Sequence, residues 1–499
     1  MRRLARLLPL LAVPVLAVPF ATSSQGATGA KYAPYVIVKD GTGEPSIGYD
    51  PKRGVAMYVA RTHVLRMSWD VKNRLTMRDV SPKPLDADDP TRDPGAYTDP
   101  RSFDPIGYLD PQTGRFFNSQ LALACSMTTY TDDLGKTWHP SQGCGPDVFL
   151  DHQSLVSGPY RLENRPPTAG LTGYPNAVYY CAQNSYSGNC ARSDDGGITF
   201  GPGFPAYNTP GNNGTDPYGG ACSAIHGHLK VSPDGVVYLP HRGCGGVPTA
   251  GNLTNSEFLG GSPALSVSED NGLTWTIRKV PGSHNQEETD PSVAADKHNT
   301  IYFGWQDGTN PPDNADGTAN YGTTSSARIA VSPDHGRTWT KPYDVSTPMG
   351  VKNVQFTQVI AGDPGRAAFA WLGTKTRGDD QHHPFSGVWH LYISTTIDGG
   401  KHWSTVDTTP NDPVQRGCIW MEGLSNKNVV ESNTCDDQRN MLDFNDMTVD
   451  RQGRVLVAYT DGCVGACVDN GKPSKDHVNM VMRQTSGPLL IAKGRYDRH

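Results

Sequence analysis

The stretch SPDHGRTW, from Ser332 to Trp339, is one of five copies of an eight-residue pattern in this chain of 499 residues. The other copies are TDDLGKTW from Thr131, SDDGGITF from Ser193, SEDNGLTW from Ser268 and TIDGGKHW from Thr396. They follow the frame Ser/Thr-x-Asp-x-Gly-x-Thr-aromatic and begin 62, 75, 64 and 64 residues apart. The Asp can accept the amide hydrogens of a tight turn, the Gly tolerates a positive φ, and the aromatic ring can pack under the next strand. Each copy therefore predicts a hairpin turn, and the regular spacing predicts a repeated structural unit.

A second pattern precedes these octapeptides: a short strand, a turn containing Pro, Asp or Gly, and a strand rich in β-branched and aromatic residues. Examples are EPSIGYDPKRGVAMYVA from Glu44, DPIGYLDPQTGRFF from Asp104, HLKVSPDGVVYLP from His228, DPSVAADKHNTIYFGW from Asp290, VIAGDPGRAAFAW from Val359 and FNDMTVDRQGRVLVAY from Phe444. Strand–turn–strand followed by strand–octapeptide–strand makes a four-stranded blade. We count seven blades, beginning near residues 44, 103, 151, 224, 290, 354 and 444, with six or eight as alternatives. The first blade is expected to complete its sheet with a strand from the other terminus.

The octapeptides resemble the Asp-box, or BNR, repeat of sialidase-like β-propellers, and the resemblance covers nearly all of the chain after its first thirty residues. It implies an all-β fold over residues 31–499, a single β-propeller of four-stranded antiparallel blades with the Asp-box turns on the outer rim. In this family the box joins the third and fourth strands, on the face away from the substrate. The resemblance therefore implies a structural role for Asp133, Asp195, Asp270, Asp334 and Asp398.

The composition agrees with a loop-rich β protein. The chain has 55 Gly and 40 Pro, and its 19% of charged residues give a net charge of -6. So many helix-breaking residues disfavour a coiled coil or a long helical protein. Without an excess of Lys and Arg, the chain does not suit nucleic acid as a partner.

The first thirty residues are expected to be a secretory signal peptide. Arg2, Arg3 and Arg6 precede an apolar run from residue 7 to 20, and small residues at 21–30 offer cleavage sites. The run is short and contains Pro14 and Pro19 among its prolines, which disfavours a membrane anchor. We therefore expect a secreted protein, extracellular or periplasmic, with no membrane span after cleavage, and a monomer.

Ten cysteines fall in close sequential pairs, which in an exported chain predicts five local disulfides. The expected pairs are Cys125/Cys144, Cys181/Cys190, Cys222/Cys244, Cys418/Cys435 and Cys463/Cys467.

Loop lengths indicate which face of the propeller carries function. The turns between first and second strands are tight, whereas long connections join second to third strands and one blade to the next. These long connections are residues 81–100, 204–221, 243–262, 306–326, 373–387 and 409–442. In a propeller they emerge on one face, around the mouth of the central channel, and long loops on a rigid scaffold usually carry binding.

Polar residues are expected to form a ring at this mouth. The starts of the inner strands supply Glu44, Asp104, His152, His226, Asp290, Gln355 and Asp446, and the ends of the second strands supply Arg61, His241, Arg242, Trp305, Gln306, Trp371, Tyr459 and Asp461. Paired carboxylates cleave glycosidic bonds, Arg binds acidic sugars, and Trp stacks on sugar rings. We predict catalytic roles for Asp446, Asp290, Asp104 and Tyr459, and substrate binding by Arg61, Arg242, His226, His241, Trp305 and Trp371. The expected partner is an extracellular glycan or polysaccharide. Trp305 and Trp371 are equally compatible with packing between blades.

The resemblance to sialidases breaks at two motifs. The family's Arg-Ile-Pro corresponds here to Glu44-Pro45-Ser46, and its Tyr-Ser-Asp-Leu, which supplies the nucleophile, corresponds to Phe444-Asn445-Asp446-Met447. A phenyl ring cannot attack an anomeric carbon. The fold implied by the resemblance is unaffected, but sialidase activity is disfavoured.

Three functions remain open. The first is a glycoside hydrolase for another glycan, with its acid and base among Asp104, Asp290, Asp446 and Glu288. The second is a non-catalytic module that binds a glycan or a protein. The third is a polysaccharide lyase, with His226 or His241 and Tyr459 as base and acid and Arg242 neutralising a uronate carboxylate. A hydrolase requires two facing carboxylates, about 5–5.5 Å or 6.5–9.5 Å apart, whereas a lyase requires His or Tyr beside Arg242.

No motif in the sequence requires a cofactor, and no metal site is predicted among the catalytic residues. The acidic stretches 86–89 and 307–316 contain oxygen ligands suited to a structural calcium ion.

Overall fold

The computed structural model consists almost entirely of β-strands. It describes residues 29–39, 43–82, 104–122, 125–143, 151–183, 187–208, 222, 225–244, 247–248, 258–259, 262–284, 289–308, 324–381, 383–421, 435, 439–473 and 476–492. In these ranges the helical segments are α1 (Ala466–Asn470) and two 3₁₀ turns, Leu162–Asn164 and Thr347–Met349. No helix within the described ranges has the length and apolar character needed to cross a bilayer. The predicted all-β class is confirmed.

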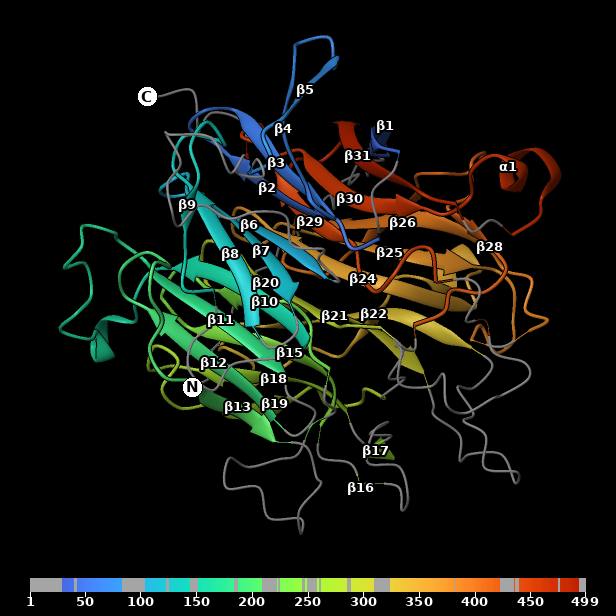
Figure 1. Cartoon of the computed structure of the whole chain (residues 1–499). Coiled ribbons are helices and arrows are strands. Elements are labelled where there is room, and N and C mark those ends of the chain that lie inside the picture. Colours follow the sequence, from blue (N-terminus) through green and yellow to red (C-terminus); the bar gives the residue numbers. More distant parts are fainter. Residues whose placement is uncertain are drawn as a thin grey trace, which may run out of the picture.

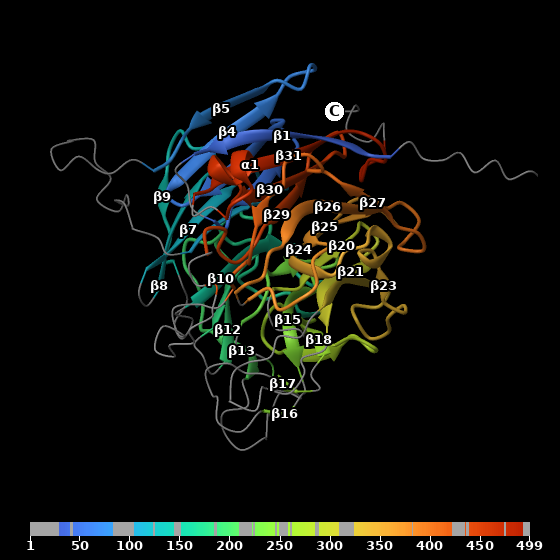
Figure 2. The ribbon, with the colours of Figure 1, turned by 90° about the vertical axis from the view of Figure 1, so that its right-hand side faces the viewer.

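Seven four-stranded antiparallel sheets form the seven blades of a β-propeller. The blades follow one another around the ring in chain order, from blue through green and yellow to red (Figures 1 and 2). Blade 1 contains β2 (Ser46–Asp50), β3 (Val55–Ala60), β4 (His63–Trp69) and β5 (Leu75–Asp79). Blade 2 contains β6 (Pro105–Leu109), β7 (Phe116–Ala122), β8 (Cys125–Thr131) and β9 (His139–Pro140). Blade 3 contains β10 (Asp151–Gly158), β11 (Ala177–Gln183), β12 (Ser187–Ser193) and β13 (Phe204–Asn208).

The remaining four blades complete the ring. Blade 4 contains β14 (Lys230–Val231), β15 (Val237–Cys244), β18 (Ser262–Ser268) and β19 (Thr276–Lys279), and β16 (Val247–Pro248) pairs with β17 (Phe258–Leu259) between its second and third strands. Blade 5 contains β20 (Ser292–Ala295), β21 (Ile301–Gly308), β22 (Ser325–Ser332) and β23 (Tyr343–Asp344). Blade 6 contains β24 (Asn353–Ala361), β25 (Ala367–Thr374), β26 (Val388–Thr396) and β27 (Ser404–Asp407), with β28 (Gln415–Arg416) added to β26. Blade 7 contains β29 (Asp446–Val449), β30 (Val455–Asp461), β31 (Val478–Ser486) and β1 (Lys31–Val38).

The ring is closed by the first strand of the chain. β1 pairs antiparallel with β31, from Lys31 opposite Ser486 to Val38 opposite Asn479, and the blue and red strands lie side by side in both views (Figures 1 and 2). The expectation that blade 1 borrows a terminal strand is therefore wrong, because blade 1 takes all four strands from residues 46–79. Blade 7 has three strands of its own, and β1 covers the backbone edge that β31 would otherwise expose.

The core lies between neighbouring blades. The second strands β11, β21, β25 and β30 are buried at every position, because both faces of each sheet pack against an adjacent blade. The apolar cluster between blades 6 and 7 illustrates this packing, with Ala368 and Leu372 on one side and Val455 and Val457 on the other. Such strands read as nearly continuous apolar runs because they have no solvent-facing side.

All five octapeptides form turns between the third and fourth strands of a blade, as predicted. In the turn of blade 3, the Ser193 hydroxyl donates to Asp195 Oδ1 at 2.7 Å. The amides of Ile198 and Thr199 donate to the same oxygen at 3.0 and 2.9 Å. The carboxylate thus replaces the backbone acceptors that a tight turn lacks. We call these five segments the repeat turns.

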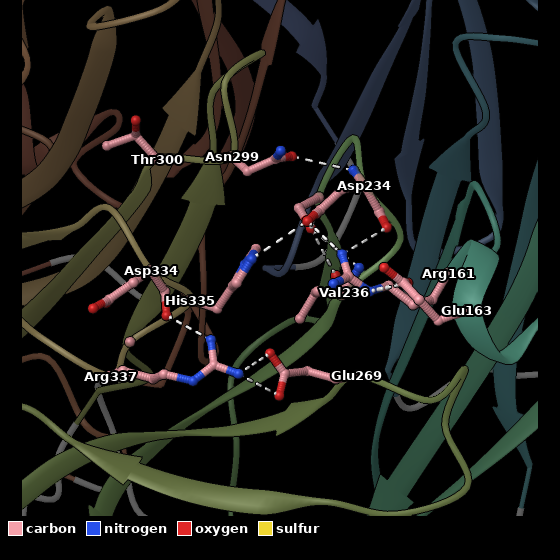
Figure 3. A network of polar contacts seen from close by, with 12 residues as sticks. Arg161, Glu163, Asp234, Val236, Glu269, Asn299, Thr300, Asp334, His335 and Arg337 are labelled. Atoms are coloured by element: carbon pink, nitrogen blue, oxygen red, sulfur yellow. Dashed lines mark hydrogen bonds and ion pairs between the residues drawn. The ribbon is translucent and has the colours of Figure 1, made fainter.

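Polar contacts join blades 3, 4 and 5 on the face that carries the repeat turns (Figure 3). Asp234 Oδ2 lies 2.7 Å from Arg161 Nη1 and 3.3 Å from His335 Nε2. Arg337 Nη2 contacts both carboxylate oxygens of Glu269, at 2.6 and 2.7 Å (Figure 3). These contacts hold the turns of adjacent blades together, and the predicted site residues take no part in them.

Four of the five predicted disulfides are formed. They are Cys181–Cys190, Cys222–Cys244, Cys418–Cys435 and Cys463–Cys467. The Cys125/Cys144 pair is not assigned, since Cys144 lies outside the described residues.

Candidate functional site

Several inner strands begin at the channel mouth with an irregular backbone. His152 has a left-handed φ of 59°, and the pairing of β10 with β11 is interrupted between Asp151 and Ser154. Phe356 has a φ of 53° at a similar interruption in β24. Left-handed φ values are costly for residues with a Cβ, and bulges of this kind redirect side chains next to functional sites. The bulge in β10 turns His152 toward blade 5.

The carboxylate of Asp290 joins two side chains from different blades, those of His152 and Arg242. Its Oδ2 lies 2.6 Å from His152 Nε2, and its Oδ1 lies 3.1 Å from Arg242 Nε. The side chain of Asp290 is 3% exposed, and those of His152 and Arg242 are each 11% exposed. Burial alone would raise the pKa of Asp290, but the charges of His152 and Arg242 and the hydrogen bond from His152 hold it well below its ordinary value. Asp290 is therefore an anion that positions an imidazole beside a guanidinium.

A second group of rings continues outward from His152. The ring of His226 lies 5.7 Å from that of His152 and 6.0 Å from that of Tyr207, and the ring of His241 lies 4.2 Å from that of Tyr207. His241 Nε2 is 2.9 Å from Ser266 Oγ. Burial, followed by the neighbouring His226, lowers the pKa of His241 well below its ordinary value, so that imidazole is neutral. Burial and the charge of Asp290 raise the pKa of Tyr207, so its phenol keeps its proton.

The structure thus brings together four of the predicted site residues, His226, His241, Arg242 and Asp290, and adds two more, His152 and Tyr207. We call these six residues the histidine cluster. The sequence predicts His152 in the ring of polar residues without a role, and it predicts a long connection at residues 204–221, which include Tyr207. Residues 204–208 instead form β13, the fourth strand that should follow the repeat turn of blade 3. The signal for this strand is its position, because a fourth strand is expected directly after each repeat turn.

Two residues predicted as catalytic lie away from this cluster. Asp446 lines the central channel, and its two oxygens accept the amides of Ile47 and Met447, each at 2.8 Å. Tyr459 is buried in the apolar cluster between blades 6 and 7. The carboxylate of Asp446 and the phenol of Tyr459 are therefore held elsewhere than the Asp290 carboxylate that contacts Arg242.

The two predicted sugar-stacking residues are packed between blades. Trp305 belongs to the cluster between blades 4 and 5, and its Nε1 donates to Asp307 at 2.9 Å. Trp371 is stacked on Tyr392 with a centroid distance of 4.5 Å and an interplanar angle of 10°. Both indoles are fully buried, so neither ring face is available to a sugar in this structure. Trp305 and Trp371 therefore pack between blades, which is the second of the two roles that the sequence allows for them.

The last two predicted residues lie near the mouth on blades 1 and 2. Arg61 is exposed at the turn between β3 and β4. Asp104 is half-buried and lines a small cavity together with Glu44, His152, Gln153, His228 and Phe444. The cavity adjoins a central channel of about 340 Å³, which is lined by residues of all seven inner strands. The predicted acid Glu288, the stretch 86–89 and residues 309–316 lie outside the described residues.

No family model matches this chain, and no curated protein matches its sequence. Solved structures are similar to it in fold. An ulvan lyase of a polysaccharide lyase family, bound to -[GlcA(1-4)Rha3S]-, has a TM-score of 0.47 and 10% identity, covering 86% of this chain and 93% of its own. A Hadza microbial sialidase has a TM-score of 0.39 and 12% identity, covering 86% and 73%. An α-L-arabinofuranosidase from Fusarium graminearum has a TM-score of 0.40 and 12% identity, covering 78% and 94%.

Proposed function

We propose that the protein is a secreted polysaccharide lyase that cleaves a uronate-containing chain at the channel mouth by β-elimination. The observation that carries this proposal is the Asp290 carboxylate, which holds His152 and Arg242 side by side. β-Elimination next to a carboxylate needs one group to stabilise negative charge and another to move a proton. Arg242 and His152 supply these two groups. The four disulfides suit an oxidising compartment outside the cell.

In the proposed reaction, the guanidinium of Arg242 binds the uronate carboxylate and lowers the barrier to removing the neighbouring C5 proton. Guanidinium groups are always cationic in proteins and match carboxylates geometrically. The imidazole of His152 takes that proton, and the electron pair of the C5–H bond forms a C4–C5 double bond as the C4–O4 bond breaks. The proton on His152 is then given to the departing oxygen.

Asp290 acts here as a positioning residue. Because it is ionised, it accepts the Nε2–H of His152 and fixes the orientation of that imidazole. It also stabilises the imidazolium that forms during the reaction. The paired carboxylate and imidazole therefore act as one unit that is oriented by the bulge in β10.

Hydrolysis is less well supported by the same residues. His152 and Arg242 hold the pKa of Asp290 well below its ordinary value, so Asp290 is ionised and cannot donate a proton as a general acid. Asp446 has both oxygens bound by backbone amides inside the channel. Tyr459, which the sequence predicts as a proton-transferring residue of a lyase, is enclosed in the core between blades 6 and 7, so the proposed reaction uses His152 instead. The imidazole of His152 shares the Asp290 carboxylate with Arg242, and it is the proton-transferring group of the proposed reaction.

The test is product analysis after incubation with a panel of uronate-containing and neutral polysaccharides. We expect products with an unsaturated, ultraviolet-absorbing end and no added water. His152→Ala and Arg242→Met should each reduce the rate by about a hundredfold or more. The matched control is His298→Ala, because His298 is an exposed histidine in the turn between β20 and β21, on the opposite face. Circular dichroism and urea unfolding establish that each variant is folded.

Three other outcomes would contradict the proposal of a lyase. Products that gain one water per cleavage would establish a hydrolase. Binding of a polysaccharide without any product would establish a non-catalytic module. Equal loss of activity in His298→Ala would remove His152 from the chemistry.

A further inference from the structure

A very small cavity lies beside the histidine cluster, where the residues at the start of the inner strands of blades 1, 2 and 3 meet. It is lined by Glu44, Asp104, Pro105, Ile106, His152, Gln153, His228 and Phe444. Its volume is about 10 Å³, which is room for one water molecule or one metal ion. A sugar ring cannot enter it, so its polar lining needs an explanation other than substrate binding.

Two buried oxygen atoms in this lining have no hydrogen-bond donor among the described residues. They are Glu44 Oε2 and Gln153 Oε1, on side chains that are 2% and 4% exposed. Gln153 is oriented, because its Nε2 donates to the carbonyl oxygen of Asp104 and leaves the amide oxygen as the free acceptor. Buried acceptors are nearly always satisfied in folded proteins, so two in one cavity indicate a ligand that supplies positive charge or donors.

The acidic groups around the cavity outnumber the neighbouring basic groups that are described, and this excess favours a bound cation. Glu44, Asp104 and Asp443 interact electrostatically, and the neighbouring cation is Arg439. Arg439 forms two hydrogen bonds with Asp443: Nη1 donates to Oδ1 at 2.6 Å and Nη2 donates to Oδ2 at 2.8 Å. Carboxylates exceed cations at this position, and the excess is buried.

We propose that Glu44, Asp104 and Gln153 form a binding site for a calcium ion at the junction of blades 1, 2 and 3. Calcium takes carboxylate and amide oxygens as ligands and tolerates irregular geometry. These three residues belong to other parts of the sequence than the acidic stretches 86–89 and 307–316, and the proposal does not depend on the proposed lyase reaction. By linking three consecutive blades at their inner ends, the ion stabilises the mouth next to His152.

The test uses the whole protein after treatment with a chelator, titrated with calcium chloride and followed by calorimetry and thermal unfolding. We expect saturable binding with one ion per chain and a rise in Tm. Asp104→Asn and Gln153→Leu should each weaken calcium binding at least tenfold. The control is Asp79→Asn, which changes an exposed acidic residue of β5 far from the cavity and should leave binding unchanged. Magnesium and manganese chlorides, run in parallel, measure selectivity.

A crossed comparison separates a lost ligand from a damaged fold. In the chelator, Glu44→Gln should unfold at the same temperature as the parent protein or higher, because a neutral amide replaces a crowded carboxyl group. In calcium, the parent protein should gain stability and Glu44→Gln should not. The proposal fails if calcium neither binds nor raises the Tm of the parent protein, which would leave a water molecule as the occupant. It also fails if Asp104→Asn and Gln153→Leu bind calcium as tightly as the parent.

Discussion

Asp290 Oδ2 lies 2.6 Å from His152 Nε2, although 138 positions of sequence separate the two residues. His152 belongs to blade 3 and Asp290 precedes the first strand of blade 5, while Arg242 of blade 4 binds the other oxygen of the same carboxylate at 3.1 Å. One buried anion therefore links three blades at the channel mouth. Four predictions follow from this and other contacts of the fold.

Asp290→Asn should affect both stability and activity. The substitution leaves His152 and Arg242 without their shared anion, and removing one partner of a buried ion pair costs about 3–5 kcal/mol. We expect the free energy of unfolding in urea to fall by about that amount, and polysaccharide cleavage to be lost at temperatures where the variant is folded. Asp79→Asn removes a half-exposed partner of His63 and should change stability by less than about 1 kcal/mol. Equal effects of the two substitutions would contradict this assignment.

Asp195→Ala should weaken the fold without affecting the site. Asp195 accepts hydrogen bonds from the amides of Ile198 and Thr199 and from the hydroxyls of Ser193 and Thr199 in the repeat turn of blade 3. Losing this acceptor should lower the free energy of unfolding by about 1–3 kcal/mol. Steady-state rates measured well below the Tm should stay at the level of the parent protein. A selective loss of activity would show that the repeat turns take part in the reaction.

Trp371→Phe distinguishes packing from sugar stacking. Trp371 lies against Tyr392 between blades and donates its indole hydrogen to Ser394 at 3.2 Å. The smaller ring leaves a cavity and an unused acceptor, so we expect a loss of about 1–3 kcal/mol in unfolding free energy. The KM for polysaccharide should not change. A KM that rises severalfold with no loss of stability would place the indole in the binding site instead.

His241 should make stability fall as the solution becomes acidic. Its folded-state pKa is held well below the ordinary 6.5 by burial and by His226. The unfolded chain therefore binds the proton more readily, so the contribution of His241 is complete above about pH 6.5 and is lost as the pH falls below it. The loss is at most about 1.4 kcal/mol per pH unit. Urea unfolding at about pH 7.5 and 5.5 measures this slope.

His241→Gln is the control for that slope. The amide can still hydrogen-bond to Ser266 but cannot titrate in this range, so the decline below about pH 6.5 should be smaller in the variant. An identical decline in both proteins would assign the acid sensitivity to other groups.

The fold could be predicted from the sequence because its repeat turns and strand patterns are local. The octapeptide beginning at Ser332 contains the groups that close its turn, and runs of β-branched and aromatic residues between turn residues mark the strands. The closing strand β1 could not be assigned in the same way, since pairing Lys31 with Ser486 depends on which edge is left open after the whole ring has formed.

The site could be predicted only in part because side-chain direction depends on register. Trp371 and Arg242 both lie in second strands, yet one points into the core between blades and the other reaches Asp290. The bulge at His152 shifts the alternation of β10, and a shift of one residue reverses the face to which a side chain points. Tyr207 lay in a segment whose polar and Gly-rich continuation resembled a loop.

The pairing of β1 with β31 also sets the order of events as the chain is made. Residues 31–38 are the first strand of the propeller to be synthesised, and their partner at residues 478–486 is the last. Until then β1 is an unpaired amphipathic segment with an open backbone edge, and it must avoid other chains while six blades assemble behind it. Ring closure is consequently a late, long-range event. A chain that is truncated before residue 478 cannot close the ring, and it exposes unpaired strand edges that can associate with other chains.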